Sequence, residues 1–410
     1  MHAVLHSACS PSCRISSPGD ESLRLDAARG LPHNRPESSR HRTEAAAAPG
    51  RRVIGKTAAI AESGVAAGAA TQNRTIRPEF TGAAGEYFRI WIVNLFFTLV
   101  TLGVYSAWAK VRKKKYFYGN TRLDGDSFDY FGNPKAILKG RIIAIAAFVL
   151  YALAGELYPA SRYAFWGLAL LLLPWLIVRA LTFNARNSAY RGLRFDFTAT
   201  AKDAAWVYIG KLAVVALTLG FVFPWFMARQ KAFVVSHHAF GTTRFACELP
   251  ARRFFGIYIR AGLILSAAGA VLGGLSALLL PKLVHFGSLS WIAFVLPAIL
   301  LYAGYAVSYA YMQSRTTNLL WANTLGPGLR FESTLAAAGL TRLYVGNLFA
   351  VACSAGLLIP WAVVRTLRYR LENFAMILEE EVVHEASPAL APVGAAGQEL
   401  GDIFNLDFGL

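Results

Sequence analysis

The stretch "TLGVYSAWAKVRKKKYFYG", residues 101–119, marks an abrupt change from apolar to basic sequence. An apolar run reaches Gly103 and then Trp108. Five cations follow within six residues: Lys110, Arg112, Lys113, Lys114 and Lys115. Tryptophan favours the headgroup level of a bilayer, and cations beside it meet anionic lipid. Because glycine weakens a helix, the stretch predicts a helix that loosens at Gly103 and is anchored at a membrane surface by Trp108.

The composition of the whole chain is that of a membrane protein. It has 410 residues, of which 55% are hydrophobic, whereas a soluble domain is usually about 45–50% apolar. The formal net charge of +17 lies beside the apolar runs, which indicates contact with anionic headgroups rather than nucleic acid. Seven apolar runs meet or approach the roughly 20 residues that a spanning helix needs, at 88–108, 138–158, 162–183, 204–227, 254–280, 289–312 and 342–364.

An internal repeat runs through this sequence. "IRPEFT" at 76–81, "LRFDFT" at 193–198 and "LRFEST" at 329–334 align with offsets of 117 and then 136 residues, and no gap is needed across 36 residues. Agreement at this many rare residue types excludes chance. The equivalent positions are Arg77, Arg194 and Arg330; Glu79, Asp196 and Glu332; Asn94, Lys211 and Asn347; Gly103, Gly220 and Gly356; Trp108, Trp225 and Trp361; Arg112, Arg229 and Arg365.

The repeat predicts an all-α polytopic membrane protein with about seven apolar helices in a 3+3+1 arrangement. Alternation of apolar and polar residues in "LRFDFT" predicts small extramembrane β elements. We expect a membrane domain at 74–383, with repeat units 74–190, 191–326 and a truncated 327–383. The flanking segments 1–73 and 384–410 lack a sustained apolar period, and we expect both to be disordered tails.

Three stretches carry a resemblance to a known family: "GEYFRIWIVN", "TLGVYSAWAKVRKKKYFYGNTRLDG" and the closing "GDIFNLDFGL". They resemble the bacterial inner-membrane proteins of domain of unknown function 898, the YjgN-like family, over about residues 78–410. The resemblance implies a multi-pass protein of the bacterial inner membrane. The family has no established activity, so the resemblance assigns no catalytic residue.

The cations predict which side of the membrane each loop occupies. Cytoplasmic loops carry an excess of Lys and Arg, and the segment 109–141 holds nine of them, whereas the turn "GELYPASR" holds only Arg162. We therefore place 109–141, 365–370 and the C-terminus in the cytoplasm. The three repeated helices have cations at both ends. Either all seven runs cross, against the charge rule, or the repeated helices cross incompletely and turn back near Gly103 and its equivalents, which we favour slightly.

Three polar residues inside the repeated apolar runs form the best candidate site: Asn94, Lys211 and Asn347. An ionisable residue deep in an apolar run indicates a pathway or a paired site by default. Quasi-symmetric repeats can bring equivalent positions to a shared polar region. The alternative is that Lys211 extends its amine to the interface and that the asparagines only join helices.

Three arginines at the strand positions form a second candidate group: Arg77, Arg194 and Arg330. Each stands two residues before an acid, and i and i+2 share a face of a strand. We expect local pairing with Glu79, Asp196 and Glu332, while capture of an anion by an arginine cluster is the alternative. Trp108, Trp225 and Trp361 are expected to be interface anchors.

The sequence carries no motif for catalysis, a metal or a cofactor. "DGDSFD" at 124–129 lacks the downstream glutamate of a calcium loop. The four cysteines have neither metal-ligand spacing nor a disulfide pattern. We therefore expect a non-enzymatic protein whose partners are membrane lipids and not nucleic acid; protein partners are not predicted. Two function classes stay open: a transporter or channel-like protein built on the repeats, and a membrane scaffold or lipid-organising protein.

Overall fold

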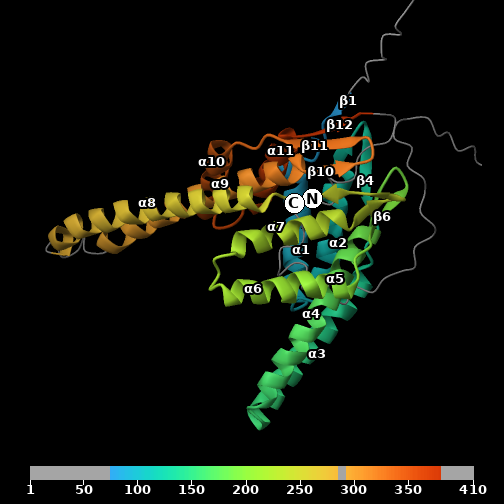
Figure 1. The fold of residues 1–410 in the computed structure, drawn as a ribbon, viewed down its shortest axis with the longest axis horizontal. Coiled ribbons are helices and arrows are strands. Elements are labelled where there is room, and N and C mark those ends of the chain that lie inside the picture. The colour runs from blue at the N-terminus through green and yellow to red at the C-terminus, as the bar shows by residue number, and fades with distance from the viewer. Residues whose placement is uncertain (1–73, 285–291, 380–410) are drawn as a thin grey trace, which may run out of the picture. The chain divides into compact units, whose positions relative to one another are not determined.

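The computed structural model describes residues 74–284 and 292–379 (Figure 1). The predictions for the two tails, 1–73 and 384–410, therefore concern residues outside the described ranges. Within those ranges, short strands alternate with long helices along the chain. The strands carry the extramembrane core, and the helices carry most of the exposed apolar surface.

Twelve short strands are described: β1 Arg74–Ile76, β2 Glu79–Phe80, β3 Thr121–Leu123, β4 Asp126–Tyr130, β5 Ser188–Tyr190, β6 Leu193–Phe197, β7 His238–Phe240, β8 Thr243–Arg244, β9 Ala246–Cys247, β10 Thr324–Gly326, β11 Leu329–Ser333 and β12 Phe374–Leu378. The α-helices are α1 Ala84–Val100, α2 Ser106–Gly119, α3 Pro134–Leu157, α4 Ser161–Arg186, α5 Ala201–Ala205, α6 Lys211–Leu217, α7 Phe223–Ser236, α8 Ala251–Val284, α9 Ile292–Ala322, α10 Ala337–Cys353 and α11 Ile359–Glu372. A π-helical turn, η1 Trp206–Gly210, joins α5 to α6 as one continuous helix.

The strands close into a ring. One sheet has the order β2-β3-β4-β5-β6-β7-β8 and the other β1-β12-β11-β10-β9, and every paired neighbour is antiparallel. β1 and β2 lie on one stretch of chain, 74–80, and β8 and β9 on another, 243–247, so each stretch joins the two sheets. Closure leaves these short strands without a free sheet edge.

All helices leave this ring at one edge. Consecutive strands are joined alternately by tight turns and by helix pairs, so in an antiparallel ring the turns gather at one edge and the helix pairs at the other. In two of the tight turns both central residues have positive φ: 49° and 87° at Asp124 and Gly125, 48° and 78° at Arg191 and Gly192. Such turns match the twist of antiparallel strands.

Five helix pairs result: α1 with α2, α3 with α4, α5–α6 with α7, α8 with α9, and α10 with α11. Each pair ends in the same cap, in which the side chain after the last helical residue bonds the carbonyl four residues earlier. The caps are Asn120 to Tyr116, Asn187 to Phe183, His237 to Phe233, Asn323 to Leu319 and Asn373 to Tyr369. Each bond satisfies a carbonyl that the helix end leaves open.

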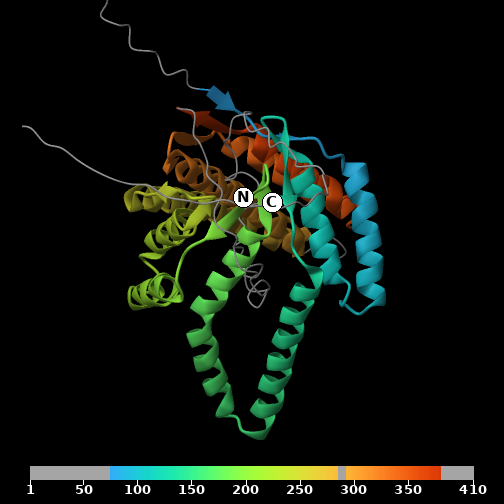
Figure 2. The same ribbon diagram turned by 90° about the vertical axis from the view of Figure 1, so that its right-hand side faces the viewer.

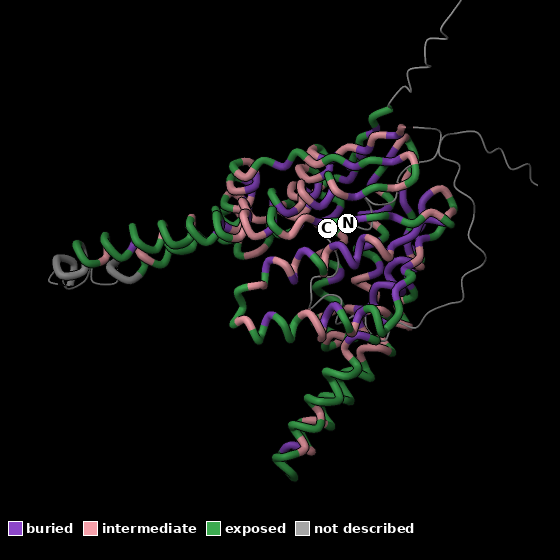
Figure 3. Tube along the Cα trace, viewed as in Figure 1, coloured by how far each residue is buried: buried purple, intermediate pink, exposed green. Residues whose placement is uncertain are grey.

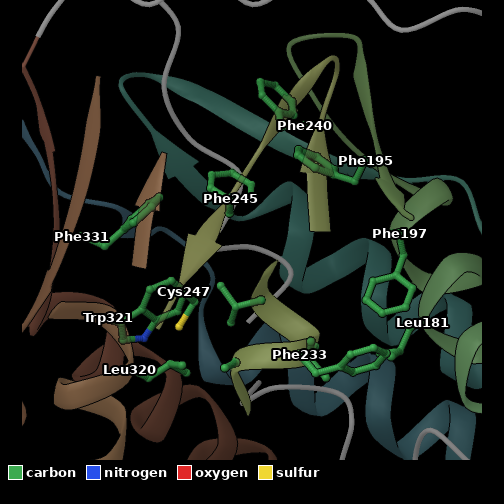
Figure 4. Close-up of a cluster of buried hydrophobic side chains, with 14 of the residues drawn as sticks. Leu181, Phe195, Phe197, Phe233, Phe240, Phe245, Cys247, Leu320, Trp321 and Phe331 are labelled. Atoms are coloured by element: carbon green, nitrogen blue, oxygen red, sulfur yellow. The ribbon is translucent and has the colours of Figure 1, made fainter. Parts of the chain in front are cut away.

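The buried faces of the strands meet in one aromatic core (Figure 4). The ring centroids of Phe195 and Phe240 lie 4.5 Å apart. Trp321, near the end of α9, lies 5.5 Å from Phe331 and brings the last strands into the same cluster. Burial of these apolar side chains stabilises strands that are too short to be held by their two or three backbone hydrogen bonds alone.

The two long helix pairs contain the candidate membrane spans. Among the described residues, three helices are long and apolar enough to cross a bilayer: 134–157 with 24 residues, 161–186 with 26 and 251–278 with 28. At about 1.5 Å per residue, even the shortest exceeds the roughly 30 Å of hydrocarbon. Figure 2 shows α3 and α4 joined at their far ends, and Figure 3 shows exposed residues along both long pairs. Phe148 and Leu171 are 68% and 74% exposed on these helices, as lipid-facing side chains must be.

The described residues form ten helices in five pairs rather than the predicted seven helices, with α5, η1 and α6 counted as one continuous helix. The number is larger because each repeated apolar run contains two helices and the turn between them. The predicted β elements exist, but they form one ring. The regular unit is a strand, a helix pair and a strand, repeated five times, with three short pairs and two long ones in alternation.

Candidate functional site

The three short helix pairs turn back at the repeated glycine. Gly103, Gly220 and Gly356 have φ of 92°, 87° and 91°, and the residue before each has φ of 47° to 50°. The glycine N–H donates to the carbonyl five residues earlier, with N–O distances of 2.7, 2.8 and 2.9 Å. This is the hydrogen bond of a helix C-terminal Schellman turn, in which glycine avoids the Cβ clash. Each repeated run is therefore a helical hairpin.

The hairpin tips are apolar and uncovered by protein. Leu102 is 94% exposed and Leu219 is 97% exposed. The neighbouring exposed side chains are Leu99, Val100, Val104, Leu217, Phe221, Leu357 and Leu358. Contiguous apolar surface of this kind marks contact with a membrane or a partner.

The short hairpins are too short to cross and return. α1 and α10 have 17 residues, while α2, α7 and α11 have 14, about 25 Å and 21 Å of helix. Both helices of a hairpin start from the same edge of the ring. The backbone at each tip is satisfied by its own turn, as lipid requires. Each repeated run thus turns back at its glycine, which is the geometry expected if these runs do not cross the membrane completely.

Asn347 and Lys211 contact the second helix of their own hairpins. Asn347 Nδ2 donates to Thr366 Oγ1 at 2.9 Å, and its Oδ1 accepts from Arg365 Nη1 at 3.2 Å. Lys211 Nζ lies 6.0 Å from the ring centroid of Trp225. Asn94 is 8% exposed, and its Oδ1 has no hydrogen-bond partner among the described residues. In the part of the chain that the structure describes, no hydrogen bond or ring contact links one of these positions to another.

The arginines at the strand positions do not form the expected local pairs. Asp196 pairs with Arg186 at 2.7 Å. Arg330 pairs with Glu379 of the neighbouring strand stretch, and the guanidinium of Arg194 lies 5.1 Å over the ring of Phe131. Asp196 is thus paired with an arginine at the end of α4, and Arg330 with an acid directly after the neighbouring strand β12. Arg77 is exposed between β1 and β2.

The repeated tryptophans lie one turn beyond the hairpin tips, on the second helix. Trp225 and Trp361 carry a cation over the ring, Lys211 at 6.0 Å and Arg365 at 5.0 Å, while Trp108 stacks on Tyr105 at 6.2 Å. A cation over an aromatic face is an attractive contact. The placement is that of an interface residue, apolar toward the tip and polar toward the ring.

Lys114 does not fit the expectation that the cations at 110–115 contact anionic lipid. It is 9% exposed, donates from Nζ to Asn184 Oδ1 at 3.0 Å and lies 5.3 Å from the ring centroid of Tyr130. This cation therefore belongs to the protein interior rather than to the lipid surface. At the equivalent position of the second hairpin, burial and the nearby Arg370 lower the pKa of Lys231 to about 8.

An open pocket of about 560 Å³ lies at the third short hairpin. It is lined by Ala84, Gly339, Arg342, Leu343, Trp361, Val364, Arg365, Arg368, Tyr369 and Glu372. Arg368 donates to the carbonyl of Gly82 at 3.2 Å, which ties the hairpin to the start of the first one. Three arginines against one glutamate give the lining a net charge of two positive units. A positively charged lining favours a negatively charged ligand.

Sequence reasoning missed Gly339, Arg342 and Arg368. Alignment of the repeats could have identified Gly339, because the other two hairpins have Glu86 and Asp203 at the same position. Among the described residues, no group of three or more His, Cys, Asp or Glu side chains is placed to hold a metal ion.

Comparison with known proteins gives a family and no activity. Inner membrane protein YjgN of Salmonella typhimurium strain LT2 is 30% identical over 142 residues, which is 34% of this chain and 35% of that protein. Inner membrane protein YjgN of Escherichia coli K12 is 29% identical over 150 residues, 35% of this chain and 36% of that protein. The match thus spans about a third of the length of these relatives. No solved structure matches.

The family comparison covers far more of the chain. The model described as "Bacterial protein of unknown function (DUF898)" matches residues 75–403. That range begins at the first strand of the ring and contains all five helix pairs. The chain therefore belongs to the DUF898 family of bacterial membrane proteins.

Proposed function

We propose that this protein is a non-catalytic, lipid-organising protein of the bacterial inner membrane. The main observation behind the proposal is that the three hairpin tips are apolar and exposed, at Leu102, Leu219 and Leu357. The second helix of each hairpin leads back to the ring. Three hairpins inserted from one side add volume to one leaflet, while the long pairs hold the protein across the bilayer. The proposed location in the inner membrane rests on the two relatives, which are inner membrane proteins.

The ring lies on the cytoplasmic side in this proposal. All helix pairs leave one edge of the ring, so the basic segments 109–141 and 365–370 share one side of the membrane. An excess of Lys and Arg favours the cytoplasm. The same argument gives the chain a cytoplasmic C-terminus, because the last described strand, β12, belongs to the ring. The cations around the hairpin bases then face the anionic headgroups of the inner leaflet.

Single cysteines in a cysteine-free background test this topology. We expect Tyr158→Cys, at the far end of the α3–α4 pair, to react with an impermeant thiol reagent in intact cells. Gly119→Cys, at the hairpin base, should react only after permeabilisation. Leu102→Cys should react in neither case, because the tip lies in hydrocarbon without water. Labelling of Leu102→Cys in intact cells at the rate of Tyr158→Cys would sink the proposal, since the first hairpin would then cross.

Reconstitution tests the lipid role. In vesicles of phosphatidylcholine and phosphatidylglycerol, the protein should concentrate fluorescent phosphatidylglycerol around itself without releasing entrapped ions or dye. A random distribution of the fluorescent lipid would refute lipid organisation, whatever the topology.

A transporter or channel-like function is the second candidate. It is favoured by the polar residues that the apolar hairpins retain, Asn94, Lys211 and Asn347, with the buried Oδ1 of Asn94 open to a ligand. Polar groups in such surroundings are costly and often functional. This candidate predicts ion or solute flux in the same vesicles, and Lys211→Leu should reduce it. Absence of flux in wild type and unchanged folding of Lys211→Leu would leave Lys211 as an interface residue.

A further inference from the structure

We infer that the pocket of the third short hairpin binds a phosphate-bearing anion, with the headgroup of an anionic phospholipid as its source in the membrane. The inference rests on the proposed lipid contact of the hairpins and adds to it a defined binding site. Among the described residues, this pocket lies at the third of the three equivalent short hairpins.

The donors of the pocket come from both helices of the hairpin. Arg342 lies on α10, and Arg365 and Arg368 lie on α11, three residues apart and so on one face. Arg365 uses one guanidinium nitrogen on Asn347 Oδ1 at 3.2 Å, which fixes the side chain. Its remaining N–H groups are available, because a guanidinium carries five donors. Arginine forks match the oxygens of a phosphate.

The other two hairpins explain why this pocket is open. At the position of Gly339 the first hairpin has Glu86, whose carboxylate accepts from the hydroxyl of Tyr116 at 3.3 Å. The second hairpin has Asp203, which is held in a capping box with Thr200. Each of those hairpins thus carries its own carboxylate at this position. The third has no side chain there.

Tyr369, the equivalent of Tyr116, fills the place left by the missing side chain. A Cβ built on Gly339 would lie 2.0 Å from the hydroxyl oxygen of Tyr369. The glycine therefore lets the tyrosine pack close to α10, and Glu372, near the ring end of α11, is the one acid among the residues that line the pocket. With three arginines and one glutamate, the lining keeps two positive charges that an external anion would neutralise.

The surroundings favour a lipid phosphate over a free one. Trp361 lies at the tip end of the pocket and Glu372 at the ring end, 11 residues apart on α11, about 16 Å along the helix. The tip beyond Trp361 is exposed and apolar at Leu357 and Leu358. A phosphate held by the arginines would leave its acyl chains along that apolar surface.

Gly339→Glu and the double variant Arg342→Gln/Arg368→Gln test the site in the purified full chain. Thermal stabilisation is measured during titration with phosphatidylglycerol, with phosphatidylcholine and with inorganic phosphate. Arg244→Gln is the matched control, because Arg244 is an exposed arginine of β8 outside the pocket. We expect phosphatidylglycerol to stabilise the wild type and the control at the same concentration, and both pocket variants to need at least tenfold more lipid.

The outcomes separate the sources of phosphate. Stabilisation by phosphatidylglycerol alone identifies a lipid site, and equal stabilisation by inorganic phosphate identifies a soluble phosphate as the ligand. Stabilisation by neither anion, or pocket variants that respond like Arg244→Gln, would overturn the inference. If Gly339→Glu fails to fold, the double variant decides. The labelling pattern of Leu102→Cys is independent of the pocket, so a failed site and a failed insertion are distinguishable.

Discussion

Replacement of the turn glycine by alanine tests the hairpin geometry directly. At Gly103, φ is 92° and an added Cβ would meet nothing within 4 Å. Gly103→Ala therefore creates no clash with the rest of the protein, and its effect comes from the backbone. Alanine in the left-handed region costs about 1–2 kcal/mol. Alanine also loses less conformational entropy than glycine on folding, which offsets this cost by about 0.5–1 kcal/mol. The free energy of unfolding should therefore fall by about 1 kcal/mol.

The same substitution in a helix should have the opposite sign. Gly262, within α8, also has open space around its Cβ position and no positive φ. Gly262→Ala is expected to raise the free energy of unfolding by about 0.5–1 kcal/mol. Because Gly103, Gly220 and Gly356 belong to separate hairpins, the triple alanine variant should lose about 3 kcal/mol, if independent sites add.

Equilibrium unfolding of the full chain in mixed detergent measures both effects. The expected result is destabilisation by Gly103→Ala and stabilisation by Gly262→Ala. Stabilisation by both would mean that the repeated glycines are helical in the membrane. The apolar runs would then continue through Gly103, and the hairpin argument would fail.

Three further predictions concern the ring and the helix ends. In a cysteine-free background, Gly119→Cys and Tyr369→Cys should resist an impermeant thiol reagent in intact cells, and labelling of either would refute the cytoplasmic placement. Asn187→Ala removes the cap bond to the Phe183 carbonyl at 2.7 Å and should lower the free energy of unfolding by about 1 kcal/mol. Burial lowers the pKa of His238 from 6.5 to about 4, so the unfolded chain takes up the proton first. Stability should therefore fall by up to about 3 kcal/mol as pH drops from about 6.5 to about 4, and His238→Gln should lose that slope in pH-dependent unfolding.

The apolar helices and the threefold repeat could be predicted from the sequence. The hairpins were only one of two alternatives that the sequence left open. A turn in water carries polar residues that accept hydrogen bonds, whereas the turn around Gly103 lies among leucines and valines. In the lipid setting that we propose for the tips, apolar side chains are favoured at the turn as much as in the helix. The glycine is then the one local signal of the break, and it is equally compatible with a loosened helix.

The ring was harder to predict than the helices because its strands have two to five residues. Alternation over so few positions identifies a strand and leaves its partners open. Pairing was fixed instead by closure, since 74–80 and 243–247 each serve both sheets. The fivefold unit was hidden for a related reason. The long and short helix pairs share little sequence, and His237 replaces asparagine in one of the five caps.

The candidate residues show that equivalent positions in a repeat need not lie close together in the fold. Equal positions in a repeat were expected to converge on one centre, as they do when the repeated helices pack on each other. Here each repeated position faces its own hairpin partner, Asn347 toward Arg365 and Lys211 toward Trp225. Function in such an arrangement depends on differences between the repeats. Gly339 is one such difference, because the other two hairpins have an acid at its position, while the third has its pocket acid at Glu372, where they have Gly119 and Ser236.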